Sequence, residues 1–319
     1  MSKPKVMFYW CASCGGCEEA VVDLGADLLT VAQAVDIVFW PAAMDFKTAD
    51  VRALADGEVA VTFLNGAVRT SEQEEMVKLL RAKSQLMVAF GSCAHLGGIP
   101  GLANLVGKEA VFAAAYRDAV TVVNPAGTVP QERAELDGCQ LELPTFSTSV
   151  RALDQVVSVD YYVPGCAPPP DLVLAAIQAI LEGKLPERGS VLSPDKTLCD
   201  GCPRNATKPD ELALSAIKRV HEVDVPPERC FLDAGVLCLG VGTRSGCGER
   251  CLRANMPCTG CFGPTSQVSD QGAKVLSAVA SLFAATDETE VAALAEAVPD
   301  PAGTFYRYSL PRSLLKGRI

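Results

Sequence analysis

The chain has 319 residues, which is enough for two domains and a sizeable core. Its 28 basic and 38 acidic residues give a formal net charge of −10, and no basic stripe runs through it, which argues against a nucleic-acid partner. Hydrophobic residues make up 49% of the chain, yet no apolar run is long enough to cross a bilayer, so we expect no direct insertion into a membrane.

The first residues, 1–5, lead straight into an apolar run, with neither a twin-arginine motif nor the apolar region of a signal peptide. We therefore expect a cytoplasmic protein. Thiols stay reduced in that compartment, so the fourteen cysteines of this chain indicate bound metal rather than disulfides.

Strand-like and helix-like segments alternate in the first part of the chain. Short apolar runs predict strands over residues 6–10, 35–40, 59–64, 86–90 and 156–163. Helical periodicity predicts helices over residues 18–34, 71–83 and 171–182, with shorter ones around 101–107 and 109–116 in the loop-rich stretch 97–150. Ser71-Glu72-Gln73-Glu74 is predicted to be an N-cap with a capping box. This alternation is typical of a doubly wound parallel sheet, flavodoxin-like at this size.

Cysteines directly follow three of the predicted strands. Cys14 and Cys17 come after the first strand, Cys93 after the fourth and Cys166 after the fifth. The carboxyl ends of parallel strands lie at one edge of a sheet, where ligands bind. We therefore expect these four thiols to converge on one metal cluster.

From about residue 185 the strand patterns stop and cysteine, glycine and proline dominate, so we predict one domain over residues 1–185 and another over 186–319. Helices are predicted over 209–221, near 268–285 and near 287–297. Eight cysteines lie between residues 199 and 261, namely Cys199, Cys202, Cys230, Cys238, Cys247, Cys251, Cys258 and Cys261. A segment so poor in regular structure can fold when metal cross-links replace a large core.

Eight thiols make two four-thiolate sites, and Cys-x₂-Cys pairs serve both zinc and iron–sulfur clusters. Structural zinc is therefore an alternative for the C-terminal block. A four-cysteine site at the ligand edge of an α/β sheet is an odd place for structural zinc, so the three sites together favour a line of iron–sulfur clusters, an electron conduit.

The chain resembles the small, electron-transfer subunit of [NiFe] hydrogenases. The matching motifs run in the family's order from about residue 5 to residue 265: Cys14-Gly15-Gly16-Cys17-Glu18, Gly91-Ser92-Cys93-Ala94, Pro164-Gly165-Cys166 followed by prolines, and the C-terminal cysteine array. The resemblance implies an iron–sulfur subunit that performs no bond chemistry itself. Electrons from H₂ oxidation in a separate large subunit would cross three [4Fe–4S] clusters to another iron–sulfur or flavin subunit.

The resemblance also implies a ligand assignment. The proximal cluster takes Cys14, Cys17, Cys93 and Cys166, the distal cluster takes Cys199, Cys202, Cys230 and Cys238, and the medial cluster takes Cys247, Cys251, Cys258 and Cys261. Respiratory members of the family have a histidine where Cys199 stands, often lack a fourth medial cysteine, and carry a leader and a membrane anchor. These departures point to the cytoplasmic group, closest to the methyl-viologen-reducing type coupled to heterodisulfide reductase.

Two cysteines remain outside these sets. Cys11 forms a rival pair with Cys14, but its favoured interpretation is a buried thiol beside the cluster. Cys139 is predicted to be free in a polar loop.

Other side chains have weaker roles. Glu18 is a candidate proton relay, against the plainer interpretation of a first-turn acid that suits the helix dipole. His95 can bond the cluster or the large subunit, although an ordinary partner in a loop is favoured. His221 is expected at a helix end. Arg244 and Arg250 can moderate the negative charge of the clusters, against simple solvation.

Two other classes of function compete. A complex-I-like subunit shares the cluster-binding fold of residues 5–180, but commonly has adjacent cysteines and lacks the eight-cysteine region. A zinc-stabilised structural protein is the third alternative.

Overall fold

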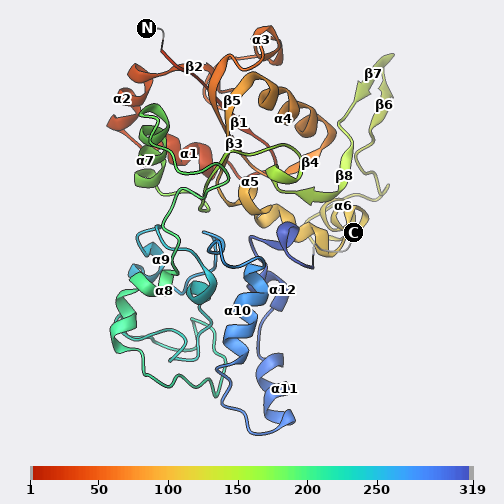
Figure 1. Ribbon diagram of the computed structural model, residues 1–319. Coiled ribbons are helices and arrows are strands. Elements are labelled where there is room, and N and C mark those ends of the chain that lie inside the picture. The colour runs from red at the N-terminus through yellow and green to blue at the C-terminus, as the bar shows by residue number, and fades with distance from the viewer. Residues whose placement is uncertain (1–2, 316–319) are drawn as a thin grey trace.

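The computed structural model describes residues 3–315 and shows an α/β part followed by a cysteine-rich part (Figure 1). The regular elements of the first part are β1 (Lys5–Trp10), α1 (Gly16–Val22), α2 (Ala26–Ala34), β2 (Asp36–Phe39), α3 (Thr48–Ala53), β3 (Val59–Asn65), β4 (Val68–Thr70), α4 (Ser71–Lys83), β5 (Ser84–Phe90), α5 (Ser92–Leu96), η1 (Ile99–Leu105), α6 (Lys108–Ala113), η2 (Ala114–Asp118), β6 (Arg133–Leu136), β7 (Cys139–Glu142), β8 (Phe146–Arg151), η3 (Leu153–Gln155), β9 (Tyr161–Val163) and α7 (Pro170–Leu181).

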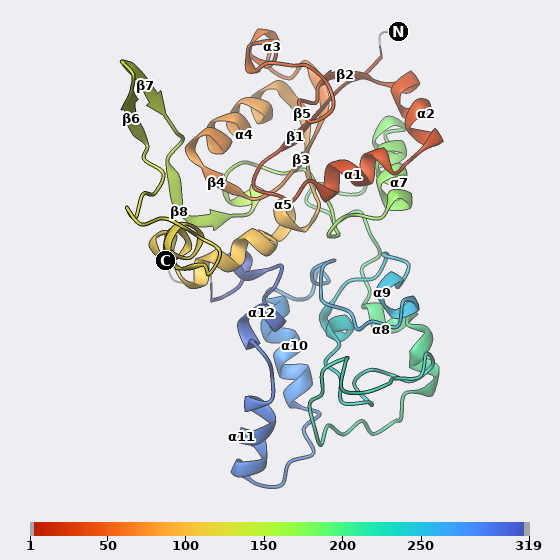
Figure 2. The same ribbon diagram turned by 180° about the vertical axis from the view of Figure 1, so that it is seen from behind.

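A five-stranded parallel sheet in the order β2-β1-β3-β5-β9 organises this part. That order is the flavodoxin-like one, so the predicted fold class is confirmed. Side chains alternate between its two faces. Val6, Phe8 and Val88 face one core with α1, α2 and α7, while Met7 and Met87 face another with α3 and α4 (Figures 1 and 2).

Several predicted elements have different limits. The helix expected over residues 18–34 is two helices separated by a turn over residues 23–25, in which Gly25, with a φ of +57°, is the N-cap of α2. The strand expected over 156–163 is only β9, because residues 156–160 form a turn and bends that follow the 3₁₀ helix η3. The capping box of α4 uses Thr70 and Gln73, one residue before the predicted pair.

Strands within residues 97–150 were not predicted from the sequence. Strand β8 pairs antiparallel with β4, and β6 with β7 forms a hairpin that projects from the body of the protein (Figure 1). Cys139 lies on this hairpin rather than in a loop.

The cysteine-rich part is mostly irregular. Its elements are α8 (Leu198–Gly201), η4 (Pro203–Thr207), η5 (Leu239–Gly242), α9 (Arg250–Arg253), α10 (Gln271–Ala280), α11 (Glu288–Glu296), α12 (Pro301–Phe305) and η6 (Leu310–Arg312). The predicted helix over 209–221 is wrong. That segment is extended instead, with Leu214 bridging to Phe283 and Lys218 to Val236.

The two parts are joined closely. Residues 190–192 continue along the edge of the sheet, where the N–H of Tyr162 donates to the carbonyl oxygen of Ser190 and its carbonyl oxygen accepts from the N–H of Leu192. The division at residue 185 stays a prediction. Within residues 3–315, no helix combines the length and the apolar character needed to cross a bilayer.

Candidate metal centres

The four thiols expected at the sheet edge are brought together. Burial, and then the negative charges of Cys93, Cys166 and Cys14, raise the pKa of Cys17. Burial and the charges of Cys166 and Cys14 raise the pKa of Cys93 to about 12, and burial with Cys14 raises the pKa of Cys166. Every pair within this set therefore interacts.

Backbone geometry at the strand ends makes this convergence possible. Gly15, with a φ of +88°, turns the chain from β1 into α1, so that Cys14 and Cys17 flank the turn. Gly91 follows β5 in a conformation that favours glycine, and a side chain there would collide with the sulfur of Cys17. The loop after β9 carries Cys166 to the same edge, before Pro170 starts α7.

A second group of thiols gathers at α8. Burial, and then the charges of Cys238, Cys202 and Cys230, raise the pKa of Cys199 to about 12. Burial raises the pKa of Cys238 to about 11, with smaller contributions from Cys230 and Cys202. The four cysteines predicted as the distal set are thus neighbours.

The third group lies around α9. After burial, the charges of Cys166, Cys247 and Cys251 raise the pKa of Cys261 to about 12. Burial raises the pKa of Cys258 well above its ordinary range, with contributions from Cys238 and Cys261.

This third group touches both of the others. The N–H of Cys258 donates to the sulfur of Cys238 at 3.3 Å, and Cys166 is close enough to Cys261 for its backbone N–H to lower, and its charge to raise, the pKa of Cys261. The Ser92 hydroxyl, next to Cys93, donates to the carbonyl oxygen of Cys261. The three groups therefore stand in series, with the third between the first and the second.

Backbone N–H groups point at several of the sulfurs. The donors are Ile99 to Cys93, Gly240 to Cys238, Glu249 to Cys247 and Gly260 to Cys258. Such bonds favour the thiolate form and tune a bound cluster.

All fourteen cysteines are free thiols. Cys11 is buried in the core formed with Met7 and Leu64, and burial raises its pKa to about 12. Cys139 is exposed. Within residues 3–315, no three Cys, His, Asp or Glu side chains are grouped tightly enough to hold a single metal ion.

Glu18 is more than a first-turn acid. Its carboxylate is buried and accepts hydrogen bonds from the indole N–H of Trp40 and from Asn65 Nδ2, the latter at 2.7 Å. Burial raises its pKa, while these two bonds oppose the rise. No local pattern pointed to Trp40 and Asn65, because they are 22 and 47 residues away.

The other weak candidates differ in their environments, and the ordinary partner expected for His95 is not found over residues 3–315. His95 is buried against the ring of Tyr162, and its Nδ1 has no hydrogen-bond partner among the described residues. Arg244 pairs with Asp195 at 2.7 Å and donates to backbone carbonyls, while Arg250 is largely exposed. His221 does not lie at a helix end, because the predicted helix is absent.

Comparison with known proteins decides the family. A family model described as NADH ubiquinone oxidoreductase, 20 Kd subunit, matches residues 14–180. An iron–sulfur subunit of the F420-non-reducing hydrogenase of Archaeoglobus profundus is 37% identical over 99% of this chain and 98% of its own length. A subunit of the F420-non-reducing hydrogenase of Methanothermobacter thermautotrophicus is 35% identical over 99% of this chain and 97% of its own length.

The chain belongs to this family of hydrogenase small subunits. It is the electron-transfer subunit of a hydrogenase, an oxidoreductase that acts on hydrogen, and members of this family carry iron–sulfur clusters and pair with a large subunit. The two archaeal relatives extend the match through the eight-cysteine region, which the family model over 14–180 leaves uncovered.

The fold agrees with that assignment. A chain of the [NiFeSe] hydrogenase of Desulfovibrio vulgaris Hildenborough superposes with a TM-score of 0.52 at 17% identity, over 83% of this chain and 94% of that one. At this identity the likeness concerns the fold alone.

Proposed function

We propose that this subunit carries electrons from H₂ oxidation in its large subunit through three [4Fe–4S] clusters to a further iron–sulfur or flavin subunit. The observation that carries the proposal is the serial arrangement of three four-thiol groups, linked by Cys166 with Cys261 and by Cys238 with Cys258. Electron transfer along a chain of redox centres needs neighbouring centres, and three adjacent thiol groups can supply them.

We assign the ligands as the sequence predicted them. The proximal cluster is bound by Cys14, Cys17, Cys93 and Cys166, the medial one by Cys247, Cys251, Cys258 and Cys261, and the distal one by Cys199, Cys202, Cys230 and Cys238. The position of the Cys247–Cys261 group between the other two supports its assignment as medial.

The residues present fit clusters of this kind. Burial, and then the charges of neighbouring cysteines, raise the pKa values of Cys93 and Cys199, and bound iron would compensate the charge of thiolates that stand together. The surrounding N–H groups supply the hydrogen bonds that sulfur ligands accept. When bound, [4Fe–4S] clusters supply reversible one-electron chemistry.

The chain's own residues set the environment of each cluster. Cys258 is buried, whereas Cys14 and Cys166 are exposed at the sheet edge. Exposed ligands at the edge of the five-stranded sheet suit a face that a catalytic subunit covers. We therefore propose that the large subunit binds against the turn that carries Cys14 and Cys17.

The acceptor and the compartment belong to the proposal as well. Relatives of this chain are named as subunits of F420-non-reducing hydrogenases. We propose a cytoplasmic complex whose acceptor is an iron–sulfur or flavin subunit of a heterodisulfide reductase system. The Glu18 proton relay also stays a prediction.

Metal and sulfide analysis of the purified complex tests the cluster count. Four-cysteine ligation of three [4Fe–4S] clusters gives about twelve iron and about twelve sulfide per small subunit, after subtraction of the metal of the other subunits. Cys258→Ala, which leaves three of the four proposed medial thiolates, should lower the iron count by at least one, whereas Cys139→Ala, at an exposed thiol outside the three sets, should leave it unchanged. Zinc without iron would support the structural alternative instead.

A further inference from the structure

Arg204 is the most deeply buried charged side chain among residues 3–315. It is 2% exposed, on the 3₁₀ helix η4. None of the ion pairs within the described part of the chain includes it. Its positive charge therefore has no carboxylate partner there.

Neutral groups surround the guanidinium. Its Nη1 donates to the carbonyl oxygens of Pro226 at 3.0 Å and Arg229 at 2.7 Å. Its Nη2 donates to the carbonyl oxygen of Leu252 at 3.3 Å and to Asn255 Oδ1. The guanidinium carbon lies 4.2 Å from the centre of the Phe231 ring. Carbonyls and a ring face solvate a cation but do not neutralise it.

The contacts of Arg204 fall next to cysteines of two sets. Arg204 itself follows Cys202 by two residues, Arg229 and Phe231 flank Cys230, and Leu252 follows Cys251. Helices α8 and α9, which carry cysteines of both sets, lie side by side (Figures 1 and 2). The buried cation thus lies where the proposed distal and medial ligands meet.

A buried charge without a counter-ion is strongly unfavourable, so a folded protein compensates it. Resting on the function proposed above, we propose that Arg204 is the counter-charge of the distal cluster and raises its reduction potential. A four-thiolate [4Fe–4S] centre is anionic and gains a further negative charge on reduction, so a fixed cation in a dry environment favours the reduced form.

The other arginines do not serve this purpose. Arg244 is neutralised by Asp195, and Arg229 is half exposed and pairs with Asp233 at 2.6 Å. Arg69, on β4, is also buried and has no ion pair among the described residues, but it lies over the ring of Phe146 in the α/β part. Lys208, whose charge lowers the pKa of Cys199, is exposed to solvent, so Arg204 is the buried cation to test.

The experiment is a redox titration of the intact complex followed by EPR, with Arg204→Gln, Arg204→Lys and Arg229→Gln. Arg204→Gln should lower the distal potential, raising the ratio of oxidised to reduced distal cluster about tenfold at a fixed ambient potential, which is about 59 mV for one electron. Arg204→Lys keeps the charge and should hold the potential near the wild-type value. Arg229→Gln removes a half-exposed charge beside Cys230 and should leave the distal potential unchanged. All three variants should leave the proximal EPR signal unchanged.

A purely structural Arg204 predicts a different pattern. Both Arg204 variants lose the guanidinium fork, so equal shifts in the two, or no shift in Arg204→Gln, would overturn the proposal. If the Arg204→Gln protein does not hold the distal cluster, Asn255→Asp replaces it as the test, because it places a carboxylate on the intact guanidinium. An unchanged distal potential in Asn255→Asp would also overturn the proposal. A wild-type complex without a distal signal would instead refute the proposed function.

Discussion

Substituting Cys199, one proposed ligand of the distal cluster, tests whether the distal set is distinct from the proximal and medial sets. Replacing its thiolate by a neutral imidazole makes a cluster less negative, and histidine ligation raises cluster potentials. We therefore expect Cys199→His to change the distal EPR signal and raise its potential, with the proximal signal intact. EPR of the reduced complex, titrated against potential, measures both.

Cys139→His is the matched control for that exchange, because it makes the same substitution at an exposed thiol on the β6–β7 hairpin. It should leave every cluster signal unchanged. A Cys199→His protein with altered proximal and unaltered distal signals would show that Cys199 does not belong to the distal cluster.

At the residue scale, the grouping of the cysteines could be predicted because each group repeats one residue type in recognisable motifs, while their role as cluster ligands stays a prediction. Arg204 and the partners of Glu18 could not be predicted. Arg204 is a common residue in an ordinary sequence context, and only the fold brings Pro226, Leu252 and Asn255 around it. Pairings across tens of residues leave no local pattern, which is why the sequence offers only Arg244 and Arg250, against simple solvation, as cations beside the clusters.

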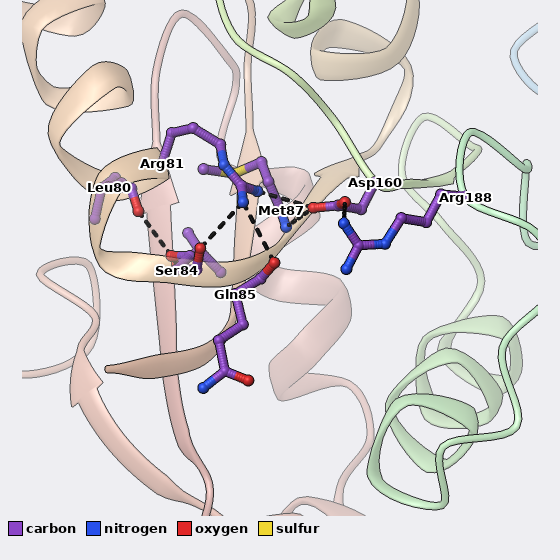
Figure 3. A network of polar contacts seen from close by, with 8 residues as sticks. Leu80, Arg81, Ser84, Gln85, Met87, Asp160 and Arg188 are labelled. Atoms are coloured by element: carbon purple, nitrogen blue, oxygen red, sulfur yellow. Dashed lines mark hydrogen bonds and ion pairs between the residues drawn. The ribbon is translucent and has the colours of Figure 1, made fainter. Parts of the chain in front are cut away.

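At the scale of elements, Asp160 joins α4, β5 and the start of β9. Its Oδ2 accepts from Arg81 Nη1 and from the N–H of Met87, both at 2.8 Å, and its Oδ1 pairs with Arg188 at 3.0 Å (Figure 3). Arg81 also donates to the carbonyl oxygens of Ser84 and Gln85. One carboxylate thus fixes the end of a helix to two neighbouring strands.

Asp160→Asn should lower the thermal unfolding midpoint of the complex and speed amide exchange at Met87. Asparagine keeps the shape but leaves Arg81 without its counter-ion, and loss of one partner of a mostly buried pair costs about 2 kcal/mol after allowance for solvent around Arg81. Calorimetry and hydrogen exchange measure the two effects.

Arg188→Gln is the control, because Arg188 is 67% exposed in the same network. Exposed pairs contribute under about 1 kcal/mol, so its midpoint should stay close to the wild-type value. An equal decrease of the unfolding midpoint in Asp160→Asn and Arg188→Gln would contradict the argument that burial makes the Asp160–Arg81 pair the more stabilising one.

The sheet was predictable because buried parallel strands are continuous apolar runs between breakers. The failures lie where tertiary pairing overrides local preference. The segment 209–221 has apolar residues that a helix can use, yet Leu214 is buried in extended chain beside Phe283. Residues 133–142 form an exposed hairpin, whose strands have no buried face to impose an alternating pattern.

At the scale of the molecule, residues 308–311 return to the α/β part. The N–H of Gly98 donates to the carbonyl oxygen of Tyr308 at 2.9 Å, and Gln155 Nε2 donates to that of Pro311 at 2.9 Å. Helix η6 packs against η1, which follows α5, the short helix that carries Cys93. The contact between η1 and η6 and the hydrogen bond from Ser92 to Cys261 both join the α/β part to the cysteine-rich part. They therefore hold the first thiol group next to the third.

Gly101→Ala tests this junction. A methyl group at residue 101 would stand 2.5 Å from both Cγ and Cδ of the Pro311 ring, so overpacking should cost about 1–3 kcal/mol and lower the unfolding midpoint. Pro311→Ala removes those two ring atoms. The double variant should therefore be more stable than the sum of the single losses predicts, by about 0.5–3 kcal/mol in a double-mutant cycle. Calorimetry of the four complexes gives the coupling. Strict additivity would mean that η1 and η6 do not meet as described, and the tail would then not hold the proposed proximal and medial clusters in register.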